Sequence, residues 1–343
     1  MESLPKDLKF ELLLNADYLT TISLCQVNKD FENICQGAYL WALKAEKDFG
    51  IKDLALLPGG NNRQRYEWLM TVSPNIGLVK AAEIDSLPLA NYFLSKGADD
   101  YNKAMFFAAY YGHLNIIKLM IDKGANNYDI TLDNAVRGGH IDVVKFLLGK
   151  SNFSYNSILG SAAEAGHIDI VKLMIEKGAN DYNWGMFLAA ENGYIDIVKL
   201  MIEKGANDYN LAMEAASEGG YIDIVKLMLN KGANNYNAAL TSAAVYNHLS
   251  IVKLLLDKGA NNFNEAMNLA ARKGYIDMVK LMLDRGANGY NRAMAIAALH
   301  GYINIVKLLL EKGANNFDEA MNLANGKGFA NIVKLIKSYL GKN

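Results

Sequence analysis

Cysteine is scarce in this sequence, which argues against a disulfide-rich secreted scaffold. Only Cys25 and Cys35 occur among 343 residues, and neither belongs to a set of paired cysteines with the spacing of a metal site. We expect both to be reduced thiols in the core of a small domain, in a protein of the cytoplasm or nucleus.

Long apolar runs and an excess of one charge are also missing. No run approaches the ~20 residues that a membrane-spanning helix needs, and the N-terminus, MESLPKDLKF, lacks the basic and then apolar pattern of a signal peptide. The 35 basic and 36 acidic residues give a net charge of −1, which argues against nucleic acid or an anionic membrane as the main partner. A composition that is 51% hydrophobic and 21% charged is ordinary for a soluble folded protein.

Most of the chain repeats with a period of 27 residues. Nine units begin between residues 97 and 313, and a glycine opens each of them except one, where Ser151 stands instead. A degenerate tenth unit occupies residues 70–96. A fixed period of 20–50 residues indicates a solenoid, in which each unit buries its apolar face against its neighbours. These lattice glycines are Gly97, Gly124, Gly178, Gly205, Gly232, Gly259, Gly286 and Gly313.

The pattern within one unit predicts two short helices. Asn or Asp always fills the sixth position, so we predict that the first helix is capped and begins there. Small residues near the twelfth position predict close packing of this helix. The second helix, IDIVKLML in several units, should end at the next lattice glycine in the left-handed conformation. The predicted caps are Asn102, Asp129, Asn156, Asn183, Asn210, Asn237, Asn264, Asn291 and Asp318.

One unit departs from this pattern. Residues 151–177 lack the lattice glycine and carry Gly160 inside the first helix. Glycine in a helix interior costs about 1 kcal/mol relative to alanine. We therefore expect this unit to be the least stable repeat of the solenoid.

The repeats resemble the ankyrin family. A unit such as AMNLAARKGYIDMVKLMLDRGAN has the leucine, the two alanines, the turn glycine, the apolar second helix and the Gly-Ala of that family. The resemblance implies an all-α, ankyrin-type solenoid. The usual unit has 33 residues, a β-hairpin finger and a Thr-Pro, whereas this unit has 27 and no proline follows Pro88. We therefore expect the fingers to be missing and binding to occur on the inner helices.

The first fifty residues follow a different pattern. Apolar clusters at Leu8, Leu24 and Leu40 predict three short helices. The segment resembles the F-box from its Leu-Pro start to its Phe-Gly end, with Tyr18 to Thr20 in place of a Pro-x-Asp turn. The resemblance implies that it docks on the Skp adaptor of a cullin–RING ubiquitin ligase. The residues matched to the adaptor-binding motif are Leu4, Pro5, Leu8, Leu12, Leu13, Leu24, Val27, Leu40 and Trp41.

A structural alternative for this segment stays open. It would be an irregular helical cap on the repeat stack, with Leu4, Leu8 and Trp41 packed inside.

The F-box and ankyrin resemblances together divide the chain into five predicted parts. They are an F-box-like domain (1–50), a connector (51–69), a degenerate capping repeat (70–96), eight ankyrin-like repeats (97–312) and a C-terminal capping repeat (313–343). In the last repeat, polar Asn325 and Lys337 replace inward apolar residues, as a terminal cap requires.

No set of residues indicates catalysis, a metal or a cofactor. His113, His140, His167 and His248 share one column with tyrosines, and their spacing of ~8–10 Å in neighbouring units is too wide to share one ion. We assign them to structural hydrogen bonds. A lysine column in the second helices has acidic residues three before or four after it, which is typical of a solvated helix face. We expect a binding protein rather than an enzyme.

The variable residues at the end of each first helix predict a target-binding groove. The groove should be aromatic at its start, acidic in the middle and basic near its end. Exposed aromatics are common anchors of protein interfaces, although drift on a solvated surface would leave the same variation. The predicted groove residues are Phe106, Tyr110, Tyr111, Arg137, Glu164, Phe187, Glu191, Glu218, Tyr246, Arg272, Lys273 and His300.

Together these patterns predict a protein–protein interaction adaptor that is monomeric when free. Its head would dock on the Skp adaptor of an SCF-type ligase, and its repeats would hold a target protein. This arrangement is similar to that of F-box/ankyrin proteins of giant DNA viruses, which implies a host protein as the target. The alternative is a non-enzymatic ankyrin scaffold with no link to ubiquitin.

Overall fold

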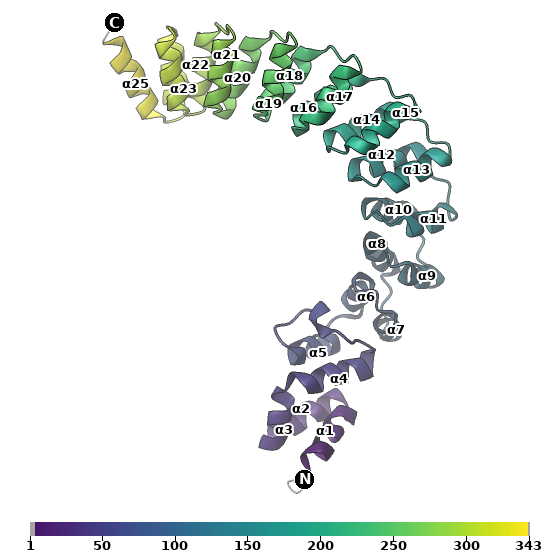
Figure 1. Ribbon diagram of the computed structural model, residues 1–343. Coiled ribbons are helices and arrows are strands. Elements are labelled where there is room, and N and C mark those ends of the chain that lie inside the picture. The colour runs from purple at the N-terminus through teal and green to yellow at the C-terminus, as the bar shows by residue number, and fades with distance from the viewer. Residues whose placement is uncertain (1–3, 342–343) are drawn as a thin grey trace. The chain divides into compact units, whose positions relative to one another are not determined.

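The computed structural model describes residues 4–341, and this range contains helices and no strands (Figure 1). The predicted all-helical repeat architecture is thus confirmed. The chain divides into two compact units between Ser154 and Tyr155, a few residues after the position where Ser151 replaces a lattice glycine. The finer domain boundaries expected from the sequence stay predictions. Within the described range, no helix is both long and apolar enough to cross a membrane.

Residues 6–49 form four helices, one more than the sequence pattern predicted. The helix predicted at the Leu24 cluster is in fact two helices, because Asn28 interrupts it with an extended backbone (φ −145°, ψ 131°). Its side chain accepts a hydrogen bond from the Asp30 N–H at 2.8 Å and so starts a new helix. The four helices, called the head below, are α1 (Lys6–Asn15), α2 (Tyr18–Val27), α3 (Lys29–Gln36) and α4 (Ala38–Phe49).

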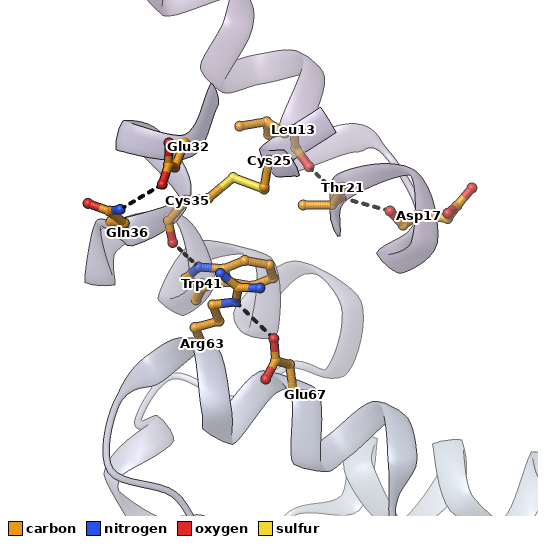
Figure 2. The surroundings of a disulfide bond; sticks show 10 residues. All are labelled: Leu13, Asp17, Thr21, Cys25, Glu32, Cys35, Gln36, Trp41, Arg63 and Glu67. Carbon is orange, nitrogen blue, oxygen red and sulfur yellow. Dashed lines mark hydrogen bonds and ion pairs between the residues drawn. A yellow bond between two sulfur atoms is a disulfide. The ribbon is translucent and has the colours of Figure 1, made fainter. Parts of the chain in front are cut away.

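A disulfide joins Cys25 of α2 to Cys35 of α3 in the core of the head (Figure 2). The prediction of reduced thiols was wrong, although both residues are buried as expected. Ten residues separate the two cysteines in sequence, but the break at Asn28 folds α3 back along α2 and brings their Cα atoms to 6.0 Å. Beside the disulfide, the indole N–H of Trp41 donates to the Cys35 carbonyl at 2.6 Å.

The head continues into a connector without a break in packing. The connector contains η1 (Leu54–Leu56) and α5 (Asn62–Thr71). The buried ring of Tyr66 in α5 packs against Trp41 and Phe49 of α4, with ring centroids 5.3 and 5.5 Å apart, and its hydroxyl donates to Asp48 at 2.6 Å. The head is therefore a part of the first compact unit rather than a loose appendage.

The remaining helices form ten successive pairs, in which a first helix is followed by a second. The pairs of the first unit are α6 (Pro74–Glu83) with α7 (Leu87–Ser95), α8 (Tyr101–Tyr111) with α9 (Leu114–Asp122), and α10 (Tyr128–Arg137) with α11 (Ile141–Leu148). Those of the second unit are α12 (Tyr155–Ala165) with α13 (Ile168–Glu176), α14 (Tyr182–Glu191) with α15 (Ile195–Lys204), α16 (Tyr209–Gly219) with α17 (Ile222–Asn230), α18 (Tyr236–Val245) with α19 (Leu249–Asp257), α20 (Phe263–Lys273) with α21 (Ile276–Asp284), α22 (Tyr290–Leu299) with α23 (Ile303–Glu311), and α24 (Phe317–Gly326) with α25 (Ala330–Leu340).

Within each unit the first helices pack closely on one another, and the second helices touch at fewer points. Buried alanines cause the difference, because a residue such as Ala189 or Ala216 lets neighbouring backbones approach. Figure 1 accordingly shows α12, α14 and α16 on the concave side of the second unit and α13, α15 and α17 on the convex side. All eight lattice glycines have a positive φ, between 91° and 111°, as predicted for the end of the second helix.

The prediction that the sixth position caps the first helix was wrong. The helices begin one residue earlier, and the residue before them, such as Asp181 or Asp208, is the N-cap. The asparagine at the sixth position instead reaches into the loop that opens the next repeat. Asn210, for example, accepts hydrogen bonds from the N–H groups of Asn234 and Asn235 at 2.8 and 2.9 Å. This side chain caps the loop of the next repeat rather than its own helix.

Candidate functional site

The head exposes a shallow apolar groove between α1 and α2. Leu4, Leu8, Leu12 and Leu24 line it, and polar residues of both helices complete its wall. Leu8 is 50% exposed and Leu12 is 40% exposed, values that are high for leucines in a domain with so small a core. We call these four leucines the head groove.

Some of the residues that the F-box resemblance assigned to adaptor binding are exposed, and others are buried in the core. Leu13, Leu40 and Trp41 lie in the core with at most 1% of their surface exposed, so their assignment to a contact surface was wrong. Leu12 and Leu13 are neighbours, and a helix turns adjacent side chains about 100° apart, so one faces solvent when the other faces the core. Pro5 is the exposed N-cap of α1, and Val27 is exposed at the end of α2 outside the groove lining.

The same burial data bear on the alternative in which the head is only a cap. That alternative places Leu4, Leu8 and Trp41 inside. Trp41 is buried, but half of the Leu8 surface faces solvent, and Leu4 is only partly covered. The apolar face of α1 therefore has no partner among residues 4–341.

In the repeats, the predicted groove residues lie on first helices or directly after them, and all are solvent-accessible. Phe106, Phe187, Glu191 and Glu218 are half-buried, and the other eight are exposed. In the first unit, the rings of Tyr110 and Tyr111 meet edge to face at 5.2 Å. In the second unit, Tyr246 donates its hydroxyl to Glu218, and this hydrogen bond raises the pKa of Tyr246 above its usual value.

Trp184 is an exposed aromatic residue that the sequence pattern did not single out. It lies in α14, 48% exposed, with its ring stacked on Phe187 at 5.2 Å between centroids. Variation at the seventh position of the unit is the signal that could have found it, because Ile130 and Leu211 hold the same column and are also exposed.

The histidine column joins neighbouring repeats, as the structural assignment predicted. The Nε2 atoms of His140 and His248 lie 2.9 Å from the carbonyl oxygens of Tyr110 and Glu218 in the preceding repeat. His113 has the same relation to the Glu83 carbonyl at 3.1 Å. In the part of the chain that the structure describes, no group of three or more His, Cys, Asp or Glu side chains is placed to hold a metal ion.

The lysine column on the second helices is paired with acid in three repeats. Lys199, Lys226 and Lys280 each contact the aspartate three residues before them, at 3.3–3.4 Å. Glu203 and Asp284, four positions after Lys199 and Lys280, are not the partners of these lysines among the ion pairs of the described residues. These lysines and aspartates are exposed, so the row is a solvated surface. Such exposed pairs contribute little energy.

Comparison with known proteins identifies the repeats. The family model described as "Ankyrin repeats (3 copies)" matches residues 78–158, 132–212, 186–266, 212–293 and 261–320, which together span more than half of the chain. No curated protein matches the chain at a significant level.

Proposed function

The chain belongs to the ankyrin-repeat family, and from this premise we propose that it is an adaptor that holds two proteins at once. Ankyrin repeats generally serve as non-enzymatic binding scaffolds, so the repeats have a role in protein–protein interaction. The head groove would dock on the Skp-type adaptor of an SCF ubiquitin ligase. The repeats would hold a target protein and bring it to the ligase.

The exposure of Leu8 and Leu12 carries the proposal for the head. Burying apolar surface stabilises a complex by roughly 25 cal/mol per Å², and contiguous exposed apolar surface often marks an interaction site. The two leucines share a groove with Leu4 and Leu24, which come from the N-terminus and from α2. The match of this segment to the F-box motif names the class of partner, and the groove supplies a surface of suitable chemistry.

Binding of recombinant Skp adaptor to the full chain tests the proposal. Leu8→Glu and Leu12→Glu each place a carboxylate in the groove, where desolvation of a charge opposes binding, and each should weaken binding about tenfold or more. Leu56→Glu is the matched control, because Leu56 is 51% exposed and lies outside the groove. Circular dichroism should show the same helical content for all three variants.

Two results would overturn the proposal for the head. One is wild-type chain that fails to bind the adaptor, and the other is binding that neither groove variant weakens. Either result would leave a plain ankyrin scaffold, the alternative that needs no ubiquitin ligase.

A further inference from the structure

Three successive first helices of the second unit carry acid and no base, and the fourth carries no charge. Helices α12, α14, α16 and α18 contain four glutamates and no lysine or arginine. Glu164, Glu191 and Glu218 hold the same position in α12, α14 and α16, and Glu214 lies one turn before Glu218. The concave row of these repeats is therefore uniformly negative where it is charged.

These four carboxylates have no cationic partner among residues 155–341. The ion pairs of this unit lie elsewhere, on the second helices and between Arg285 and Asp257. The neighbours of the glutamates are neutral: Tyr246 donates to Glu218, and the Ser242 hydroxyl lies 3.5 Å from Glu214. A surface that serves only solubility commonly mixes both signs of charge, whereas this one leaves its negative charge uncompensated.

A stacked pair of accessible aromatic rings, Trp184 and Phe187, lies within the same row. Trp184, Phe187 and Glu191 follow one another at i, i+3 and i+7, so they share one face of α14. The Trp184 ring lies over Gly160 of α12, where a Cβ atom would stand only 3.1 Å from the indole nitrogen. Glycine at this position therefore gives the ring room to lie against α12 while half of its surface stays exposed.

We propose that this acidic–aromatic face, formed by Glu164, Glu191, Glu214, Glu218, Trp184 and Phe187, binds an extended basic segment of a partner protein that carries an apolar anchor. The inference rests on the proposed function, since it names the chemical class of the target that the repeats hold. The anchor packs against Trp184 and Phe187. The basic side chains meet the glutamates of successive helices.

Spacing favours a basic peptide over a bound metal ion. Neighbouring helices lie ~8–10 Å apart, which is too far for equivalent glutamates to share one cation. Three residues of a polyproline II segment make one turn and rise about 9 Å, so basic residues at every third position share one face and reach one glutamate after another. A polyanion such as nucleic acid would be repelled by the same charges.

Fluorescence anisotropy with a defined peptide tests the inference on the full chain. The probe is a labelled peptide of about 13 residues, roughly 40 Å long as polyproline II, with lysine at every third position and leucine or serine between. One control peptide has glutamate for each lysine, and another has serine for each leucine. Low ionic strength keeps the charge attraction unscreened.

The decisive comparison is between two triple variants with the same change of charge. Glu164→Gln, Glu191→Gln and Glu218→Gln together should weaken the lysine probe about tenfold, because each exposed charge pair contributes modestly. Glu176→Gln, Glu203→Gln and Glu311→Gln remove the same charge from second helices and should change affinity less than twofold. Replacing leucine in the probe should also weaken binding.

Equal weakening by both triple variants would overturn the inference, because it would reveal attraction to net charge alone. Absence of probe binding, or equal binding of the glutamate peptide, would overturn it as well. Skp-adaptor binding, measured on the same variants, keeps the two proposals separate. The triple variant of Glu164, Glu191 and Glu218 should bind the probe about tenfold more weakly and bind the adaptor as the wild type does. Failure of the wild-type chain to bind the adaptor would refute only the ligase role.

Discussion

The amide oxygen of Asn183 accepts a hydrogen bond from the backbone N–H of Asn207, 24 residues later, at 2.8 Å. The same relation recurs in both units, for example from Asn102 to Asn126 and from Asn291 to Asn315. Each such asparagine satisfies the loop that opens the next repeat. The near-identical Asn-rich loops are therefore explained as links between neighbouring repeats in a solenoid without fingers.

Replacing Asn210 tests this link. Asn210→Ala removes two hydrogen bonds to backbone N–H groups and should lower the free energy of unfolding by about 1–2 kcal/mol. Asn210→Asp keeps an accepting oxygen and should restore most of that loss. Asn230→Ala, at an exposed helix end, is the control and should have little effect. Urea denaturation measures all three, and equal losses for Asn210→Ala and Asn230→Ala would contradict the link.

Gly160 and Trp184 should be energetically coupled. Alanine in a helix interior is favoured over glycine by about 1 kcal/mol, but at Gly160 its Cβ would crowd the Trp184 ring. Gly160→Ala alone should therefore bring little stabilisation, whereas in a Trp184→Ala background it should bring about 1 kcal/mol. A double-mutant cycle measures the coupling, and purely additive effects would show that the ring does not depend on this glycine.

The disulfide of the head should contribute measurably to stability. It closes a short loop between Cys25 and Cys35, and loop-closure entropy gives about 2–3 kcal/mol for a loop of this length. A reducing agent should lower the melting temperature of the wild type and leave the already lowered value of Cys25→Ala/Cys35→Ala unchanged. If the reducing agent had no effect on the wild type, the disulfide would not form in solution.

The ion pair between Lys9 and Asp30 should make the head sensitive to acid. The nearly buried ammonium of Lys9 lies 2.7 Å from Asp30, and this hydrogen bond holds the pKa of the Asp30 carboxyl below its usual value. Because the folded pKa is lower than the unfolded one, the pair stabilises the fold above about pH 4 and the effect is lost as the pH falls through the folded pKa. Lys9→Met should raise the pKa of Asp30 in an NMR titration, and Lys6→Met should not.

The regular parts of this fold could be predicted because each repeat obeys local rules. A glycine every 27 residues ends a helix because glycine, which has no Cβ, adopts a positive φ without steric cost. The column of histidines and tyrosines repeats with the same period. The N-cap was misplaced because an asparagine side chain can serve either its own helix or a distant loop. The sequence of one unit does not distinguish those two partners.

The head was harder to predict because its features depend on how helices fold back on one another. Cys25 and Cys35 meet only because Asn28 breaks an apolar run that resembles one helix. Leu12 and Leu13 have the same chemistry and opposite environments. The position of the Trp184 ring likewise depends on Gly160 in the preceding repeat, and the sequence of one repeat does not reveal such a contact between repeats.

Whether this chain holds two proteins at once can be measured in a single titration. The full chain is first saturated with Skp adaptor and then titrated calorimetrically with the lysine-containing probe. We expect the probe to bind the preformed complex with the same Kd as the free chain, because the head groove and the acidic–aromatic face consist of different residues. A probe that displaces the adaptor, or that no longer binds once the adaptor is present, would contradict the claim.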